Sequence, residues 1–233
     1  MTQWVDLDAN GSSMRTAVAQ SARADDAGVL VCMHGPGVDA FILGICEALA
    51  GAGFTAVAPD LYHRQKEPDP DPLARLRALR DVAILDDLTV AARHLATLSD
   101  PLRRHVIGFC MGGRLSYLWA TEDLALRSAV VFYGGGILRS WGEGSSPFER
   151  TGGIRCPVLG LFGKEDTNPS PADVAAISSE MDRLAKPHEF VSYDGAGHAF
   201  LNEARPSYRE EAARDAWRRC IAWLQRHSDR SAD

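Results

Sequence analysis

The side chain best suited to covalent chemistry is Cys110, which lies within the sequence GFCMGG at residues 108–113. Two β-branched residues precede this segment, and a helix-like run follows it at residues 114–120. The pattern predicts a strand, a sharp turn and a helix, with a nucleophile at the turn. Glycines two positions either side of the cysteine are expected, because side chains would collide where the chain reverses. Taken alone, the pattern also fits a buried structural cysteine.

Two further residues are the partners that a nucleophilic cysteine needs. Asp166 lies in GKEDTNP directly after an apolar run, and His198 lies in GAGHAF after a strand-like run. Each alone is an ordinary loop residue. Together, His198 would take the thiol proton and later deliver it to a leaving group, while Asp166 would orient the imidazole. The order of nucleophile, acid and histidine therefore predicts a Cys-His-Asp catalytic triad.

The elements that must position these residues alternate between strand-like apolar runs and helical patterns, which is typical of βαβ units in a parallel sheet. The expected strands are residues 14–20, 28–33, 54–58, 104–109, 128–133, 157–162 and 189–193. Helices are expected at residues 40–52, within 73–98, after Cys110, at 171–184 and at 208–225. No repeat or linker marks a second domain, so residues 1–233 are predicted to form one α/β domain with short disordered tails and no large lid.

Composition restricts the possible partners. The chain has 233 residues, of which 45% are hydrophobic and 24% charged, as in a globular protein with a sizeable core. A net charge of -6 argues against binding to nucleic acid or to an anionic membrane surface. We therefore expect a small-molecule substrate and a chain that acts as a monomer or a homodimer.

The cysteines and the apolar segments indicate a location and argue against a metal site. Five cysteines are widely spaced without a C-x-x-C pair, which favours reduced thiols. Neither a signal peptide nor a membrane-spanning run is recognisable, so a cytoplasmic location is expected. Neither H-E-x-x-H nor a tight histidine pair occurs, so we predict no catalytic metal.

Four segments together carry a family resemblance: GFCMGG at 108–113, PDLY at 59–62, GKED at 163–166 and GAGHAF at 195–200. With them the sequence resembles the dienelactone hydrolase family over roughly residues 28–224. A cysteine at the turn is unusual among α/β-hydrolases but typical of this family. The resemblance implies an α/β-hydrolase fold, in which helices cover both faces of a mostly parallel sheet, and a triad of Cys110, His198 and Asp166.

The same resemblance implies an activity. It indicates hydrolysis of a carboxylic ester or lactone, as by a carboxymethylenebutenolidase, through a thioester acyl-enzyme and without a cofactor. An oxyanion hole is expected from the N–H of Met111 and from one N–H in the loop after residues 28–33. Because Pro36 has no N–H, Gly35 is the first choice there and Gly37 the alternative.

One departure from the family lies at His34, where dienelactone hydrolases carry a glutamate thought to help draw the proton from the resting thiol. Two interpretations remain open. His34 is either the structural histidine of an H-G loop, as in many esterases, or a contact of the thiol or substrate. An adjacent imidazolium would favour the thiolate, so the second interpretation predicts a more thiolate-like Cys110 than a glutamate would allow.

A second departure concerns substrate charge. The family's type enzymes hold a substrate carboxylate with arginines, one of them a few residues after the catalytic histidine, where this chain has Asn202. Other arginines are available but are by default solvated charges on helix faces, namely Arg75, Arg77, Arg80 and Arg205. A neutral ester, a different lactone or a thioester is therefore as plausible a substrate as dienelactone.

Two aromatic residues, Tyr133 and Trp141, follow the strand beside the nucleophile and are expected substrate contacts, with core packing as the alternative.

The sequence is consistent with three functions. The first is an ester or lactone hydrolase, the second an acyl-thioester hydrolase or acyltransferase with the same triad, and the third a non-catalytic binding protein on the same fold. Two N–H donors beside an intact triad argue against the third, because binding alone does not need them.

Overall fold

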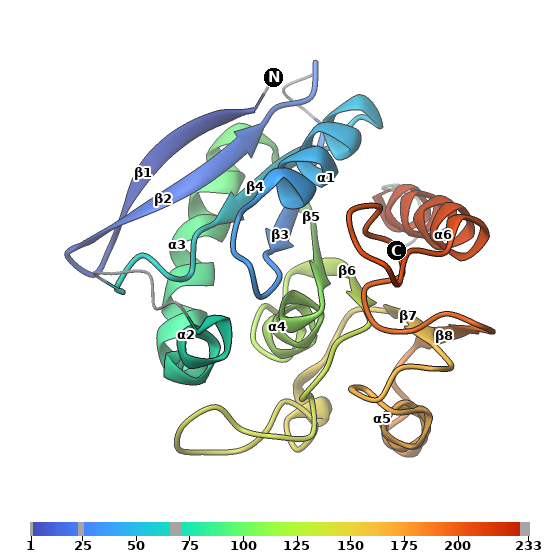
Figure 1. The fold of residues 1–233 in the computed structure, drawn as a ribbon. Helices are drawn as coiled ribbons and strands as arrows, with labels where there is room; N and C mark the ends of the chain where they lie inside the picture. Colours follow the sequence, from blue (N-terminus) through green and yellow to red (C-terminus); the bar gives the residue numbers. More distant parts are fainter. Residues whose placement is uncertain (1, 23–25, 66–70, 229–233) are drawn as a thin grey trace.

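The computed structural model describes residues 2–22, 26–65 and 71–228. Its centre is an eight-stranded sheet with the order β1-β2-β4-β3-β5-β6-β7-β8 (Figure 1). The strands are β1 (Gln3–Ala9), β2 (Ser12–Ala19), β3 (Ala27–Cys32), β4 (Thr55–Pro59), β5 (Asp100–Phe109), β6 (Leu126–Phe132), β7 (Val158–Gly163) and β8 (His188–Tyr193). Strands β3 to β8 are parallel, whereas β2 pairs antiparallel with both β1 and β4. This confirms the predicted, mostly parallel sheet.

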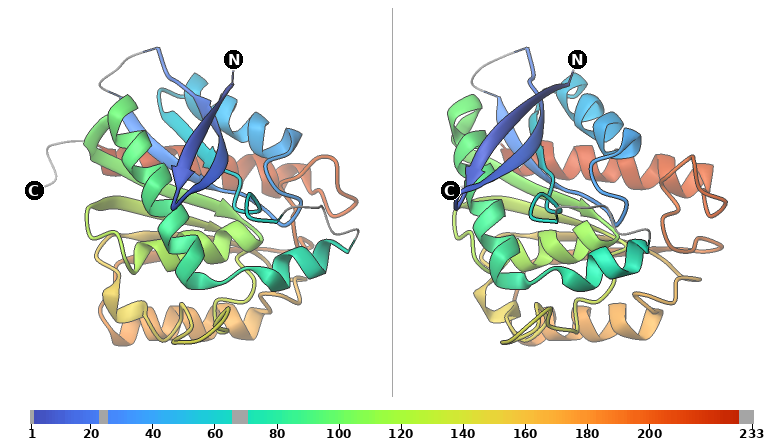
Figure 2. Two further views of the ribbon diagram at one scale, coloured as in Figure 1. Left: turned by 90° about the vertical axis from the view of Figure 1, so that its left-hand side faces the viewer. Right: turned by 60° about the vertical axis from the view of Figure 1, so that its left-hand side comes forward.

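Helices cover both faces of the sheet. They are α1 (Ala40–Gly51), α2 (Pro72–Ala78), α3 (Asp81–Leu98), α4 (Met111–Ala120), α5 (Pro171–Arg183) and α6 (Glu210–Ser228), with a short 3-10 turn η1 (Thr151–Gly153). Helices α1 and α6 lie on one face, and α3, α4 and α5 lie on the other (Figures 1 and 2). Strands β3, β4 and β7 are buried along their whole length because both of their faces are covered.

The described part of the chain contains no large lid, as expected from the sequence. None of its helices combines the length and the apolar character that crossing a membrane requires. Met1 and residues 229–233, which belong to the tails expected to be disordered, lie outside the described ranges.

Strand β1 is the one strand that the hydrophobic pattern missed. Its side chains alternate between exposed and partly buried positions, so it lacks the continuous apolar run of the inner strands. The signal that identifies it is Asn10-Gly11, at which both residues have positive φ and which joins β1 to β2 with Ala9 paired to Ser12. Asn-Gly is favoured in such two-residue hairpin turns because both central residues need positive φ.

A buried ion pair joins the helices that follow and precede β5. The Arg114 side chain of α4 is fully buried, and its two terminal nitrogens donate to the Asp81 carboxylate at 2.6 and 2.8 Å. The guanidinium also donates to the carbonyl oxygens of Gly136 and Arg139. Asp81 begins α3, so the expected helical region 73–98 is divided into α2 and α3. The pair thereby ties the loop after β6 to both helices.

Close backbone contacts hold α4 against the sheet. A Cβ atom on Gly108 would lie 1.9 Å from the Gly112 carbonyl oxygen, and one on Gly112 would lie 2.0 Å from the carbonyl oxygen of Cys32. Both distances are far below van der Waals contact. The glycines predicted around Cys110 are therefore required where the end of β3, the end of β5 and the start of α4 meet.

Replacing Gly112 with alanine is expected to lower the free energy of unfolding by roughly 1–3 kcal/mol, because the added methyl group must displace backbone. Gly44→Ala is the matched control, since a Cβ on this residue of α1 meets no atom within 4 Å. That control should stabilise the protein by about 0.8–1 kcal/mol through helix propensity. Urea denaturation measures both values, and equal changes in the two variants would contradict this packing.

Candidate active site

Cys110 lies between β5, which ends at Phe109, and α4, which begins at Met111. Its backbone has φ 58° and ψ -117°, a conformation that costs a residue other than glycine about 1–3 kcal/mol. The Cys110 N–H donates to the Phe132 carbonyl oxygen at 3.0 Å, and the Cys110 carbonyl oxygen accepts from the Gly113 N–H at 3.0 Å. The predicted strand-turn-helix arrangement is confirmed, and its strained turn lifts the thiol above the carboxyl edge of the sheet.

The loops after β7 and β8 bring Asp166 and His198 together. The Asp166 side chain is 2% exposed, and its Oδ2 lies 2.8 Å from Nδ1 of His198. Its Oδ1 accepts a hydrogen bond from the Asn168 N–H at 2.8 Å, which fixes the carboxylate. With Nδ1 engaged, the His198 ring has Nε2 left for the neighbouring Cys110 thiol, and the two groups lie close enough to shift each other's pKa. The structure thus brings together the three side chains predicted as a triad.

Electrostatics in this line favour a charged pair. Burial raises the pKa of the Cys110 thiol. The His198 ring, through its hydrogen bonding and charge, and the N–H groups of Met111 and Gly35 lower that pKa by more than burial raises it. The net pKa of Cys110 lies below its ordinary value. For His198, burial lowers the pKa, but bonds to Asp166 and Cys110 and their negative charges raise it to about 10. Both shifts favour a Cys110 thiolate beside a His198 imidazolium over the neutral pair.

The two expected oxyanion donors converge on the nucleophile. The N–H groups of Met111 and Gly35 lie close enough to the Cys110 sulfur to lower the pKa of its thiol. The alternative donor, the N–H of Gly37, instead donates to the His34 carbonyl oxygen at 2.9 Å. The structure therefore favours Gly35 over Gly37 as the second donor.

His34 faces the start of α1. Its Nε2 lies 2.9 Å from Asp39 Oδ1, and its ring centroid is 5.3 Å from that of Phe41. Burial outweighs the attraction of Asp39 and lowers the pKa of His34, so the ring is neutral near pH 7. The lowered pKa of Cys110 comes from His198 and from the N–H groups of Met111 and Gly35, and the His34 ring packs toward Asp39 and Phe41. This placement supports the structural interpretation of His34.

The two predicted aromatic contacts lie in different surroundings. Tyr133 has φ 38°, and its ring centroid is 5.3 Å from that of His198. Its buried hydroxyl finds no hydrogen-bond partner among the residues described. The Trp141 ring instead covers the Arg114 guanidinium at 4.0 Å, and the backbone N–H of Trp141 donates to Asp81 Oδ2. Tyr133 thus contacts the catalytic histidine, whereas Trp141 packs on the buried ion pair.

Tyr62 lies beside the nucleophile, and the sequence marks it only as part of the PDLY segment. Tyr62 is 2% exposed, and its hydroxyl donates to the Gly35 carbonyl oxygen at 2.8 Å. The same hydroxyl lies 3.7 Å from the Met111 sulfur. The Arg75 guanidinium covers the Tyr62 ring at 4.1 Å. Tyr62 therefore touches both residues that direct an N–H at Cys110.

The arginines named from the sequence divide into two groups. Arg75 lies next to the site because its guanidinium covers the Tyr62 ring. The exposed Arg205 lies near His34, where its positive charge adds to the effect of burial in lowering the pKa of His34. Arg77 instead lies 3.8 Å from Asp71, and Arg80 donates to carbonyl oxygens of α2 and its C-cap. Only the first pair is placed near the catalytic residues.

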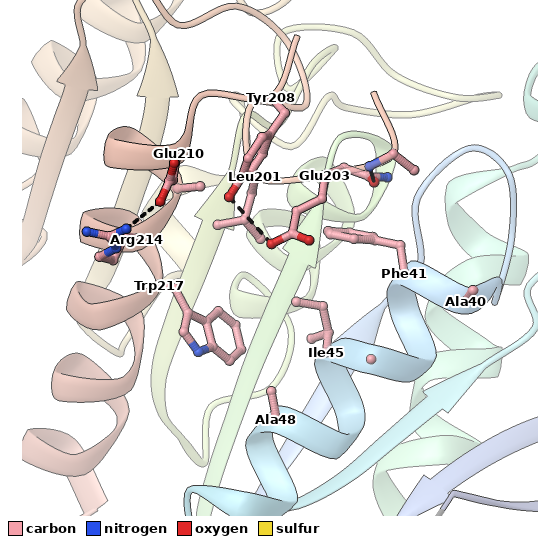
Figure 3. Close-up of a pocket in the computed structure, with 14 residues that line it drawn as sticks. Ala40, Phe41, Ile45, Ala48, Leu201, Glu203, Tyr208, Glu210, Arg214 and Trp217 are labelled. Atoms are coloured by element: carbon pink, nitrogen blue, oxygen red, sulfur yellow. Dashed lines mark hydrogen bonds and ion pairs between the residues drawn. The ribbon is translucent and has the colours of Figure 1, made fainter. Parts of the chain in front are cut away.

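A groove of about 680 Å³ lies beside the site, between α1 and α6 (Figure 3). Phe41 and Ile45 enter it from α1, Trp217 enters it from α6, and Leu201 closes one end. None of the three triad residues lines it. Asn202, which occupies the place of the family's arginine, is buried at its edge. Asn202 thus presents an amide to the groove, and Arg214, which also lines it, is paired with Glu210.

Comparisons with known proteins identify the family. A family model described as "Dienelactone hydrolase family" matches residues 14–228. A Salmonella typhimurium protein named "Putative carboxymethylenebutenolidase" is 32% identical over 231 residues, covering 95% of this chain and 86% of that protein. A Bradyrhizobium protein named "Probable 2-oxo-3-(5-oxofuran-2-ylidene)propanoate lactonase" is 30% identical over 239 residues, covering 96% of this chain and 94% of that protein. A crystal structure titled "Putative Dienelactone Hydrolase" from Klebsiella pneumoniae has a TM-score of 0.88 and 31% identity, covering 97% of this chain and 98% of that one.

The rate of Cys110 alkylation by iodoacetamide should follow a pKa below that of an ordinary thiol. Because the folded-state pKa is lowered, the thiolate persists to a lower pH than an ordinary thiolate does, and it is lost as the pH falls through the lowered value. His198→Ala should raise this pKa, because burial remains and the stabilising partner is gone. Burial raises the pKa of the other cysteines, which therefore react slowly: Cys32, Cys46, Cys156 and Cys220. A wild-type value above about 8.5 would contradict the charged pair.

Proposed function

Because the chain belongs to the dienelactone hydrolase family, we propose that it hydrolyses carboxylic esters or lactones through a covalent intermediate on Cys110. The family indicated by the four sequence segments is confirmed by the match over residues 14–228. The observation that carries the mechanism is the line from Cys110 through His198 to the buried Asp166, with two N–H groups on the sulfur.

In the first step, the Cys110 thiolate attacks the carbonyl carbon of the substrate and a C–S bond forms. The N–H groups of Gly35 and Met111 bind the oxyanion that develops on the carbonyl oxygen, which preorganised donors stabilise strongly in a water-poor site. His198 then gives its proton to the leaving alkoxide as the C–O bond breaks. A lactone ring opens in this step, and the acyl group stays on Cys110 as a thioester.

In the second step, neutral His198 takes a proton from a water molecule, and the resulting hydroxide attacks the thioester. The C–S bond breaks, the carboxylic acid leaves, and the Cys110 thiolate is restored beside the His198 imidazolium. Asp166 holds the imidazole in the tautomer that both steps need. Tyr133, in contact with the His198 ring and with a free buried hydroxyl, is a substrate contact in this scheme.

The substrate class follows from two observations. The name of the Bradyrhizobium relative describes a lactonase, which supports a lactone as substrate. Asn202 supplies an amide where the family's type enzymes have a carboxylate-binding arginine. We therefore expect neutral esters and lactones to be accepted at least as well as anionic ones.

Cys110→Ala is expected to lower kcat/KM for p-nitrophenyl acetate and for a neutral lactone by at least about 10³-fold, because no other group forms the acyl-enzyme. Cys220→Ala, which removes a fully buried thiol from α6, is the matched control and should keep full activity. Steady-state hydrolysis of these two substrates and of cis- and trans-dienelactone measures both the nucleophile and the charge preference.

Two outcomes would contradict the proposed hydrolysis, and a third would contradict the expected charge preference. Undiminished turnover in Cys110→Ala would show that Cys110 is not the nucleophile. Covalent labelling of Cys110 without turnover of any substrate would indicate a binding protein on the same fold. A strong preference for dienelactone over neutral esters would refute the expectation drawn from Asn202 alone.

A further inference from the structure

The two N–H groups that face Cys110 come from segments far apart in the sequence. Gly35 lies in the loop after β3, and Met111 is the first residue of α4. An oxyanion hole functions only when its donors are held in place before the charge develops. Backbone contact at Gly112 already sets the start of α4 against the end of β3, so the part of the hole that remains to be held is the Gly35 peptide.

The loop that carries Gly35 has little packing of its own at this residue. A Cβ atom placed on Gly35 would meet no atom within 4 Å, so no neighbouring group packs against Gly35 in that direction. The N–H of Gly37 donates to the His34 carbonyl oxygen and closes a tight turn. This hydrogen bond does not involve the Gly35 carbonyl oxygen. The carbonyl oxygen of Gly35 is instead bound by the Tyr62 hydroxyl at 2.8 Å.

Tyr62 is itself firmly placed. Its N–H donates to Asp60 Oδ1 at 3.0 Å, and the Arg75 guanidinium covers its ring. Burial raises the pKa of Tyr62 to about 12, so its hydroxyl remains a proton donor at neutral pH. The hydroxyl lies 3.7 Å from the Met111 sulfur, at the other half of the hole.

We propose that Tyr62 is the positioning residue of the oxyanion hole, whose hydroxyl fixes the Gly35 peptide beside Met111 so that both N–H groups point at the reacting centre. This inference rests on the proposed function, since it assigns Tyr62 a role around the same nucleophile. Tyr62 acts through Gly35 and makes no contact with the reacting atoms in this scheme.

Tyr62→Phe tests the role, because it removes the hydroxyl and keeps the ring under Arg75. We expect kcat for p-nitrophenyl acetate to fall by roughly 10- to 100-fold with KM nearly unchanged, as for misplaced donors to a transition state. The alkylation pKa of Cys110 should also rise, because the same N–H groups stabilise the thiolate.

Tyr117→Phe is the matched control. Tyr117 is also buried, and its hydroxyl lies 2.7 Å from Thr151 Oγ1 and 3.6 Å from the Met181 sulfur, away from the catalytic residues. Its loss should leave kcat and the alkylation pKa of Cys110 unchanged. Urea denaturation of both variants reports any general loss of stability.

Wild-type kcat and alkylation pKa in Tyr62→Phe, with Cys110→Ala inactive, would overturn the positioning role and leave the proposed function standing. Equal losses in Tyr62→Phe and Tyr117→Phe would also overturn it, since they would reflect packing alone. If Cys110→Ala stayed active, the proposed function would fail. An unchanged alkylation pKa in Tyr62→Phe would refute the role of Tyr62 whatever the result for Cys110→Ala.

Discussion

The chemistry of this protein depends on the interaction between the Cys110 thiol and the His198 imidazole, each of which shifts the pKa of the other. Burial at the edge of the sheet opposes a charge on either group, because a low-dielectric site disfavours ionisation. Mutual attraction, the buried Asp166 carboxylate and two N–H donors reverse that preference. The reactivity of Cys110 thus depends on geometry, since a displacement of His198, Asp166 or the N–H donors would favour the neutral, less reactive thiol.

The sheet supplies that geometry. Strands β3, β5, β7 and β8 are parallel, so the loops bearing Gly35, Cys110, Asp166 and His198 all emerge at one edge. Backbone contact through Gly112 sets the start of α4 against the end of β3, and Tyr62 bridges the loop after β4 to the loop after β3. Sites of this kind need support around the reacting groups, because donors and nucleophile must stand in place before substrate arrives.

Sequence patterns located most of the sheet, the glycines around Cys110 and the strand-end positions of Asp166 and His198, because each carries a local signal. Partners that meet only through the fold were not foreseeable. Pairing of His34 with Asp39, burial of Arg114 against Asp81 and the stacking of Trp141 on that pair all join segments whose distance no spacing reveals. Strand β1 was missed for another reason, since its half-exposed residues lack an apolar run and only the Asn-Gly turn marks it.

The central claim is that Cys110 becomes acylated during turnover. Rapid quenching in acid during hydrolysis of p-nitrophenyl acetate, followed by peptide mass spectrometry, tests it directly. One acetyl group on the peptide containing Cys110, removable by hydroxylamine and absent from Cys110→Ala, is the result that the account predicts. Acetylation of a different residue, or continued turnover with no acetyl group on Cys110 at any time point, would contradict it.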